Sequence, residues 1–262
     1  MTVPLRVERP DEGVVLLTLD LPDRRNAMTE ELTSAWATAV EQLRGDRTVR
    51  CIVVTGAGKS FCAGGDLGWL QAEPDATVDA LRDRMMPFYR TWLSLRSLDV
   101  PSIAAVNGAA VGAGGALALS ADIRYAGAGA KFTVPFGQLG MHAGMATTWL
   151  LPEVVGLAAA RELLLTGRVC DAGEMLRLGL ASAVYPDGDL LDAALVHARE
   201  VASAAPVAAR LHKVALSNGG HASFEQALQW EAVAQPVTLA TADLQEGLRA
   251  KVEKRPAVFT GR

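Results

Sequence analysis

Two glycine-rich stretches are the parts of this 262-residue chain best suited to contact a ligand through the backbone. They are TGAGKSFCAGGDL at 55–67 and NGAAVGAGGALALSAD at 107–122, and each follows an apolar run. The second stretch has no charged residue before Asp122, so its side chains cannot supply an acid, a base or a metal ligand. Small residues leave backbone N–H groups accessible, and helix N-termini carry unpaired donors and partial positive charge. We therefore predict two amide donors that hold one developing negative oxygen.

Close packing of a helix on a sheet, or a nucleotide site, could also account for stretches of this composition. A phosphate loop would need a glycine five positions before the GKS at 58–60, where Val53 stands instead. Neither stretch matches GxGxxG followed by an acidic ribose ligand. Cys51, Cys62 and Cys170 lack metal-binding spacing and are expected to be reduced thiols, with no obvious partner that would activate one as a nucleophile.

The elements that must position these stretches follow from hydrophobic periodicity. Short apolar runs alternate with helical patterns in the first half of the chain, which predicts an α/β fold with a largely parallel sheet. From 144 onward helices dominate around a strand-like 180–186, with breaks at Gly167, Pro206 and 218–220. The earlier expected elements are strands at 14–21, 51–56, 101–108, 122–127 and 131–135, and helices at 29–46 (capped by Thr29), 81–98 and 112–121.

The composition of the chain argues against nucleic acid as a partner and against a membrane span. Half of the residues are apolar, 21% are charged and the formal net charge is −4, so there is no basic surplus for a nucleic-acid backbone. The polar N-terminal segment lacks the apolar core of a signal peptide, and no stretch approaches eighteen uninterrupted apolar residues. We expect a soluble, cytoplasmic protein without a membrane span.

Six segments together resemble the enoyl-CoA hydratase/isomerase, or crotonase, family in their order and spacing. They are RRNAM (24–28), SFCAGGDL (60–67), PSIAAVNGAAVGAGGALALSADIRYAG (101–127), KFTVPFGQLG (131–140), LLPEVVG (150–156) and EKRPAVFTGR (253–262). The resemblance implies a core spiral of ββα turns over 1–195 and a helical C-terminal region over 196–262. It further implies that this region serves oligomerisation, as a homotrimer or a homohexamer.

The resemblance also implies an acyl-CoA or enoyl-CoA ligand, whose coenzyme A belongs to the substrate and is not a permanently bound cofactor. Its thioester carbonyl would lie between the backbone N–H groups of Gly65 and Ala113, in agreement with the prediction from the glycine-rich stretches. No metal is implied. The coenzyme A portion would contact Arg25, Ala27, Ala63, Gly64, Asp66, Leu67, Lys254 and Phe259. The acyl group would lie among Trp69, Phe136, Leu139 and Gly144.

Three positions depart from the family pattern. The two glutamates with which hydratases hold a water would fall at Ala116 and Phe136, and the single proton-shuttling acid of isomerases would fall at Gly144. General acid–base groups contribute about 10²–10⁴-fold, so efficient hydration by the usual route is not expected. The backbone donors remain, and such donors alone can stabilise an enolate.

His142 is the candidate replacement acid or base, because it lies two residues from Gly144 and histidine titrates near neutrality. A structural histidine at the rim is the alternative. Tyr89, Asp79 and Asp83 are expected to be solvated or packing residues. Two functions stay open at this point: a crotonase-type isomerase, hydratase or lyase, and a non-catalytic protein that binds or carries acyl-CoA. A purely structural oligomer is disfavoured, because a vestigial cleft has no reason to stay unobstructed.

Overall fold

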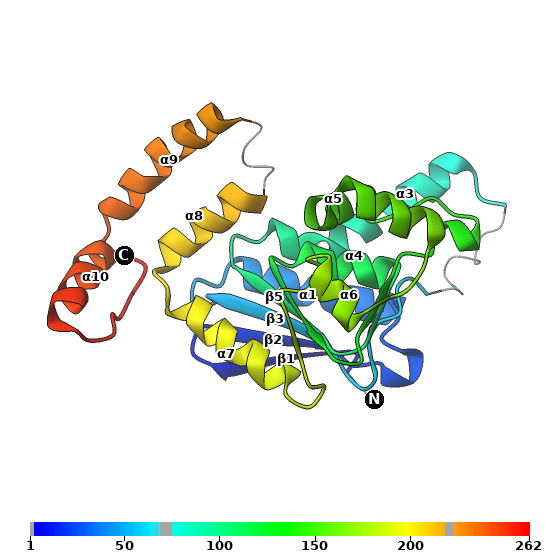
Figure 1. Cartoon of the computed structure of the whole chain (residues 1–262), viewed down its shortest axis with the longest axis horizontal. Helices are drawn as coiled ribbons and strands as arrows, with labels where there is room; N and C mark the ends of the chain where they lie inside the picture. The colour runs from blue at the N-terminus through cyan, green and yellow to red at the C-terminus, as the bar shows by residue number, and fades with distance from the viewer. Residues whose placement is uncertain (1–2, 67, 69–74, 218–222) are drawn as a thin grey trace.

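The computed structural model describes residues 3–66, 68, 75–217 and 223–262 (Figure 1). Its larger sheet has the order β1-β2-β3-β5-β7-β10, with β1 antiparallel to β2 and the other neighbours parallel. The smaller sheet has the order β4-β6-β8-β9. The strands are β1 (Leu5–Asp11), β2 (Val14–Leu19), β3 (Cys51–Gly56), β4 (Ser60–Cys62), β5 (Ser102–Val106), β6 (Ala109–Val111), β7 (Ile123–Gly127), β8 (Lys131–Thr133), β9 (Cys170–Asp171) and β10 (Ala183–Tyr185).

The chain winds as a spiral of ββα turns, as the resemblance implied. In successive turns it passes from β3 to β4, from β5 to β6 and from β7 to β8, leaving the larger sheet for the smaller one each time. Helical segments then return the chain to the larger sheet, in the last turn by way of the short strand β9 of the smaller sheet. Stacked turns therefore place the ends of β4, β6 and β8 side by side, although long segments separate them in the sequence. The expected α/β class with a mostly parallel sheet is confirmed.

Both faces of the larger sheet are covered, which explains why β2 and β3 are buried at every position. Val14 faces Ala194 of α7 (Leu190–Ser203), and Val15 faces the opposite side with Trp36 of α1 (Glu30–Arg44). The predicted cap of α1 is present, because the Thr29 side chain accepts a hydrogen bond from the Leu32 N–H at 3.2 Å. Apolar residues at consecutive positions of one strand therefore pack into two separate hydrophobic cores, one on each face of the larger sheet.

Three local predictions differ in detail from the structure. The helix expected at 81–98 is α3 (Val78–Trp92), followed by a separate 3-10 turn at Ser94–Ser97. The helical stretch after 144 is α5 (Thr147–Thr166), kinked at Gly156 (φ 74°, ψ 160°) and ended by Gly167 as predicted. Strands β4 and β6 were not expected, because each is a three-residue segment inside one of the two glycine-rich stretches, where small residues do not indicate a strand. The other helices of this half are α4 (Ala113–Ser120) and α6 (Ala172–Arg177).

The C-terminal part is helical as expected and ends in three helices, of which the last two lie away from the sheets (Figure 1), while the first is held at the segment before β5 by a hydrogen bond from Lys213 to the Val100 carbonyl. They are α8 (Pro206–Ser217), α9 (Phe224–Leu239) and α10 (Ala242–Glu253). Helix α7 packs on the larger sheet along its whole length through Leu190, Ala194, Ala198 and Ala202. The division between 1–195 and 196–262 stays a prediction, and it falls inside α7. In the part of the chain that the structure describes, no helix combines the length and apolar character that crossing a bilayer requires.

Candidate functional site

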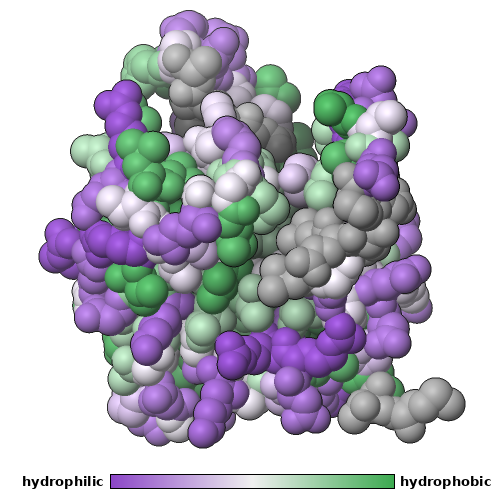
Figure 2. All heavy atoms as spheres, turned by 90° about the vertical axis from the view of Figure 1, so that its right-hand side faces the viewer, coloured by the Kyte–Doolittle hydropathy of each residue, from purple (hydrophilic) through white to green (hydrophobic). Residues whose placement is uncertain are grey.

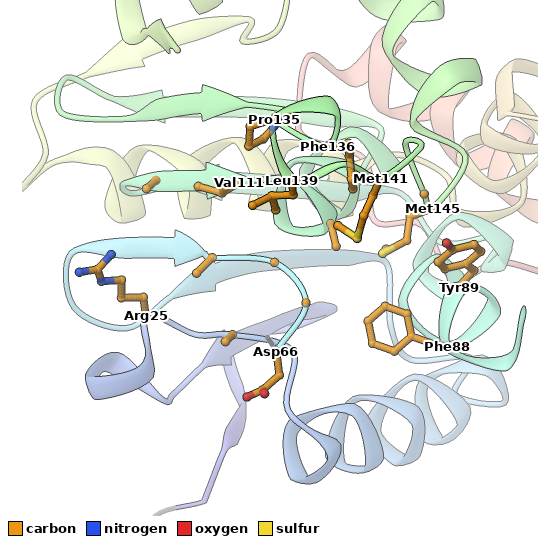
Figure 3. A pocket seen from close by; sticks show the side chains of 18 of the residues that line it. Arg25, Asp66, Phe88, Tyr89, Val111, Pro135, Phe136, Leu139, Met141 and Met145 are labelled. Carbon is orange, nitrogen blue, oxygen red and sulfur yellow. The ribbon is translucent and has the colours of Figure 1, made fainter. Parts of the chain in front are cut away.

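A cavity of about 660 Å³ opens between the smaller sheet, α3 and the segment that follows β8 (Figure 3). Its described lining comes from five segments that are far apart in the sequence, and the ββα spiral brings them together. On the side of the molecule that carries α3 and α5, apolar side chains reach the surface among polar ones (Figure 2). Leu139 of the cavity lining is 60% exposed. The lining segments lie within 24–27, 60–68, 85–89, 109–113 and 135–145.

The two turns predicted to carry amide donors meet at this cavity. Ala113 is the first residue of α4, so its N–H has no partner within the helix. Gly65 follows β4 in an isolated bridge with Met28, in which the Met28 N–H donates to the Gly64 carbonyl at 2.8 Å. The donor of this hydrogen bond is Met28, and the Gly65 N–H takes no part in it. Both residues line the cavity, and both N–H groups belong to turns that a ligand there can reach.

Glycine is required at two positions where these turns touch. At Gly64, with φ +91°, a Cβ atom would lie 2.6 Å from the Val111 carbonyl oxygen and 3.3 Å from the Ala113 nitrogen. At Gly114 a Cβ atom would lie 2.1 Å from the Cys62 carbonyl oxygen. Both distances below 3.0 Å exclude a side chain without a backbone shift. The small residues therefore allow close packing and, by the same contacts, keep two amide-bearing turns adjacent.

The loop before α1 is held against β4 by one buried asparagine. Asn26 adopts a left-handed backbone conformation (φ 55°) and is fully buried. Its side-chain amide donates to the carbonyl oxygens of Ala57 (3.0 Å) and Ser60 (2.8 Å), and its Oδ1 accepts from the Leu21 N–H at 2.9 Å. This clamp explains why the RRNAM segment places Arg25 and its neighbours along the cavity.

Of the residues expected to contact coenzyme A, some line the cavity, one lies outside the described residues, and two lie away from the cavity. Asp66 lines the cavity and forms an ion pair with Arg24 at 2.5 Å, so it braces its turn. Leu67 lies outside the described residues. Lys254 caps the C-terminal end of α10, and the Phe259 carbonyl accepts a hydrogen bond from Arg50 at 2.7 Å, so neither belongs to the described cavity lining of this chain. The remaining members, which do line the cavity, are Arg25, Ala27, Ala63 and Gly64.

The expected acyl end of the cavity is apolar. Phe136 is partly buried beside Gly112, where a Cβ atom would lie 3.7 Å from its ring. Leu139 and Gly144 also line the cavity, whereas Trp69 lies outside the described residues. Ala116, the position that the resemblance gave to one hydratase glutamate, is fully buried in the core and is not part of the described lining.

Helix α3 contributes lining residues that the sequence analysis did not assign to the site. Met85, Phe88 and Tyr89 face the cavity, and Figure 3 shows Phe88 and Tyr89 beside Met145 at one end of it. A Cβ atom on Gly144 would lie 2.6 Å from the Tyr89 hydroxyl oxygen. The signal that could have indicated this side of α3 is the spacing of Met85, Phe88 and Tyr89, which places all three on one face of the helix.

His142 lies at the exposed rim of the cavity. Its Nδ1 is 2.8 Å from the carbonyl oxygen of the next residue, Ala143. In the neutral ring this contact makes Nδ1 the N–H donor and leaves Nε2 with the free lone pair. The geometry is compatible with proton transfer at Nε2 and with a rim histidine held by backbone, so both alternatives of the sequence analysis stay open. Among the described residues, no cluster of three or more His, Cys, Asp or Glu side chains is arranged to hold a metal ion.

The cysteines are expected to be inert in the folded protein. Cys62 is fully buried and its thiol donates to the Asn26 carbonyl oxygen at 3.1 Å. Burial raises the pKa of Cys62 and of Cys51 to about 12, and that of Cys170 to about 11. We expect a disulfide reagent at pH 8 to label native Cys51 and Cys62 roughly a thousandfold, and native Cys170 roughly a hundredfold, more slowly than a free thiol, because the thiolate reacts. Labelling in urea is the control, and rapid labelling of native Cys62 would contradict this assignment.

Comparisons with known proteins agree with this geometry. The family model described as enoyl-CoA hydratase/isomerase matches residues 9–262. The chain is 46% identical over 177 residues to the probable enoyl-CoA hydratase EchA14 of Mycobacterium tuberculosis, covering 68% of each chain. It is 36% identical to the 1,2-epoxyphenylacetyl-CoA isomerase of Escherichia coli, over 96% of this chain and 97% of that one. The crystal structure of an enoyl-CoA hydratase from Bacillus anthracis superposes with a TM-score of 0.92 at 32% identity, covering 99% and 100% of the two chains.

Proposed function

The chain belongs to the enoyl-CoA hydratase/isomerase family, and from that premise we propose an enzyme that stabilises the enolate of an acyl-CoA thioester and moves a proton. One observation carries the proposal. The cavity keeps two amide-bearing turns together, while Asp66 is the only carboxylate among its described lining residues and is paired with Arg24. A site of this kind favours enolate chemistry over activation of water by two carboxylates.

The proposed mechanism begins with the thioester carbonyl between the N–H groups of Gly65 and Ala113. A base removes a proton from the adjacent carbon, the C–H electron pair becomes the enolate double bond, and the carbonyl π pair moves to oxygen. The two N–H groups stabilise this oxyanion, and one such donor is worth about 10²–10³-fold in rate. His142 Nε2 is the proposed base, and it returns the proton to the same carbon or, in a 3-enoyl chain whose enolate is extended by the C3–C4 double bond, to the γ-carbon, which leaves a 2-enoyl product. The coenzyme A portion extends past Arg25 and Ala63.

A second function is supported by the same cavity. Phe136 and Gly144 carry no group that exchanges protons, and His142 is exposed at the rim. A protein with this lining binds acyl-CoA without chemistry if His142 does not act. Calorimetric binding of a saturated acyl-CoA together with hydration of crotonyl-CoA, followed by loss of its enoyl absorbance, separates the possibilities. Tight binding with hydrogen–deuterium exchange next to the carbonyl supports the enzyme, tight binding alone supports a carrier, and rapid hydration contradicts both proposals.

Replacing His142 tests the proposed base directly. His142→Ala is expected to slow deuterium exchange at the carbon next to the thioester carbonyl by about 10²–10⁴-fold, because a general base is lost while the oxyanion donors remain. Exchange is measured by NMR of a saturated acyl-CoA, and its dissociation constant should stay unchanged. His197→Ala, whose ring contacts Tyr185 and Glu200 away from the cavity, is the matched control. An unchanged exchange rate in His142→Ala would exclude this residue as the base.

The proposal includes assembly as a homotrimer or homohexamer. Helices α8 and α9 support it, because large apolar side chains such as Leu216, Phe224 and Val233 are strongly exposed on them in the single chain. Lys254 and Phe259 lie on the same C-terminal part, so a role of these two residues toward coenzyme A rests on that assembly.

A further inference from the structure

Tyr89 carries a hydroxyl at the apolar end of the cavity, beside Met145 and Phe88 (Figure 3). A Cβ atom on Gly144 would lie 2.6 Å from its hydroxyl oxygen and 3.1 Å from the ring carbon Cζ. The hydroxyl therefore occupies the volume that any side chain at position 144 would fill. Because residue 144 is a glycine, the space beside its backbone is open, and the Tyr89 hydroxyl occupies it.

This hydroxyl is a neutral donor with no partner in the part of the chain that the structure describes. Burial raises the pKa of Tyr89, so the phenol keeps its proton throughout the neutral range. The neighbouring lining residues Met85, Phe88 and Met145 offer no oxygen acceptor in their side chains. An acyl group that fills this end without an acceptor displaces water from the hydroxyl and leaves it unpaired, which is unfavourable.

The position of Tyr89 is restricted, because the C-terminal half of α3, which carries it, is packed on α1. Trp92, one turn later, stacks on Trp36 with ring centroids 5.1 Å apart. The Trp92 indole N–H donates to the Thr33 hydroxyl at 3.1 Å, and the Trp36 indole N–H donates to the Thr91 carbonyl at 3.0 Å. Both tryptophans are fully buried. A donor held by such packing acts as a fixed feature of the pocket.

We propose, building on the proposed function, that the Tyr89 hydroxyl determines specificity by donating a hydrogen bond to an oxygen on the acyl group itself. The substrate class is an acyl-CoA whose acyl group carries a carbonyl, hydroxyl or ether oxygen beyond the thioester, in preference to a plain alkyl chain. Because a bound acyl group without an acceptor would cover the hydroxyl and leave it unpaired, the preference for the oxygenated acyl group is expected to be about tenfold to a hundredfold in affinity.

The test compares binding of hexanoyl-CoA, 4-oxohexanoyl-CoA and 5-oxohexanoyl-CoA by calorimetry. The wild-type protein should bind at least one oxo compound about tenfold to a hundredfold more tightly than hexanoyl-CoA. Tyr89→Phe keeps the ring and should bring that ratio close to one, while hexanoyl-CoA binds at least as tightly as to the wild type. Tyr185→Phe, whose hydroxyl contacts His197 away from the cavity, is the matched control and should keep the preference.

A second variant changes Gly144 and leaves Tyr89 intact. Gly144→Ala keeps the phenol but puts a methyl group into its place, so it should also abolish the preference. An unchanged preference in Tyr89→Phe, with hexanoyl-CoA still bound, overturns this inference alone. Equal loss of deuterium exchange for all three compounds in Tyr89→Phe, with binding unchanged, also overturns it, because Tyr89 would then carry a proton. Absence of binding by all three compounds to the wild type overturns the proposed function and this inference together.

Discussion

Gly64→Ala is expected to lower the rate of any proton exchange or turnover of an acyl-CoA by about 10²–10³-fold, the effect of losing one oxyanion donor. Gly64 has φ +91°, which disfavours a side chain, and its Cβ atom would lie 2.6 Å from the Val111 carbonyl oxygen. The same methyl group would lie 3.3 Å from the Ala113 nitrogen. The turn must therefore move away from the N-terminus of α4, and the N–H groups of Gly65 and Ala113, which we propose as the two oxyanion donors, would no longer point at one oxygen.

The measurement is deuterium exchange into a bound saturated acyl-CoA, with thermal unfolding recorded to establish that the variant is folded. Gly45→Ala is the control, because Gly45 ends α1 with φ −88° and a Cβ atom there has no heavy atom within 4 Å. It should exchange at the wild-type rate. If Gly64→Ala is folded and exchanges within about threefold of the wild type, the two amides do not form the oxyanion site.

The largest expected effect on stability comes from Asp122→Ala. The Asp122 carboxylate lies 2.9 Å from Nζ of Lys213, whose side chain is only 3% exposed. It also accepts hydrogen bonds from the Ser102 N–H and hydroxyl, both at 2.7 Å, while Lys213 donates to the Val100 carbonyl at 2.7 Å. Removing one partner of a buried pair leaves the other charge uncompensated, and we expect a loss of about 3–5 kcal/mol in the free energy of unfolding.

The same variant should show a characteristic pH dependence. Burial lowers the pKa of Lys213, and Asp122 opposes that shift, so Asp122→Ala takes the folded-state pKa further below its unfolded value. Between the two values the unfolded state binds more protons, and stability therefore rises with pH through that window. Urea unfolding should show a smaller deficit at about pH 9.5 than at pH 7.

Two further variants make this prediction specific. Asp122→Ala combined with Lys213→Met should recover most of the loss, because the uncompensated charge is gone. Glu12→Ala, at an exposed position in the turn between β1 and β2, should change stability by less than about 0.5 kcal/mol. A deficit in Asp122→Ala below about 1 kcal/mol at pH 7 would mean that Lys213 finds another partner or water without cost.

The sequence by itself determined the features that depend on short-range physics. Apolar runs predicted the buried strands β2, β3 and β5, and Thr29 and Gly167 predicted the start of α1 and the end of α5. The glycine-rich stretches predicted turns where a ligand can approach the backbone, because the absence of a Cβ atom is a property of the residue itself. Those turns and the family resemblance were sufficient to predict that Gly65 and Ala113 lie at one site.

Only the tertiary structure decided which distant residues share one cavity. Strands β4 and β6 pair with each other in the smaller sheet, and the glycine-rich stretches that contain them carry no local strand signal, so only this pairing defines them. Tyr89 was expected to be solvated or packed; it packs against the core, and closure of the spiral also places its hydroxyl against Gly144. Lys254 and Phe259 were expected beside the ligand, and the single chain holds them outside the described cavity lining. Local periodicity fixes which face of an element is buried, whereas contacts between remote segments depend on how the whole spiral closes.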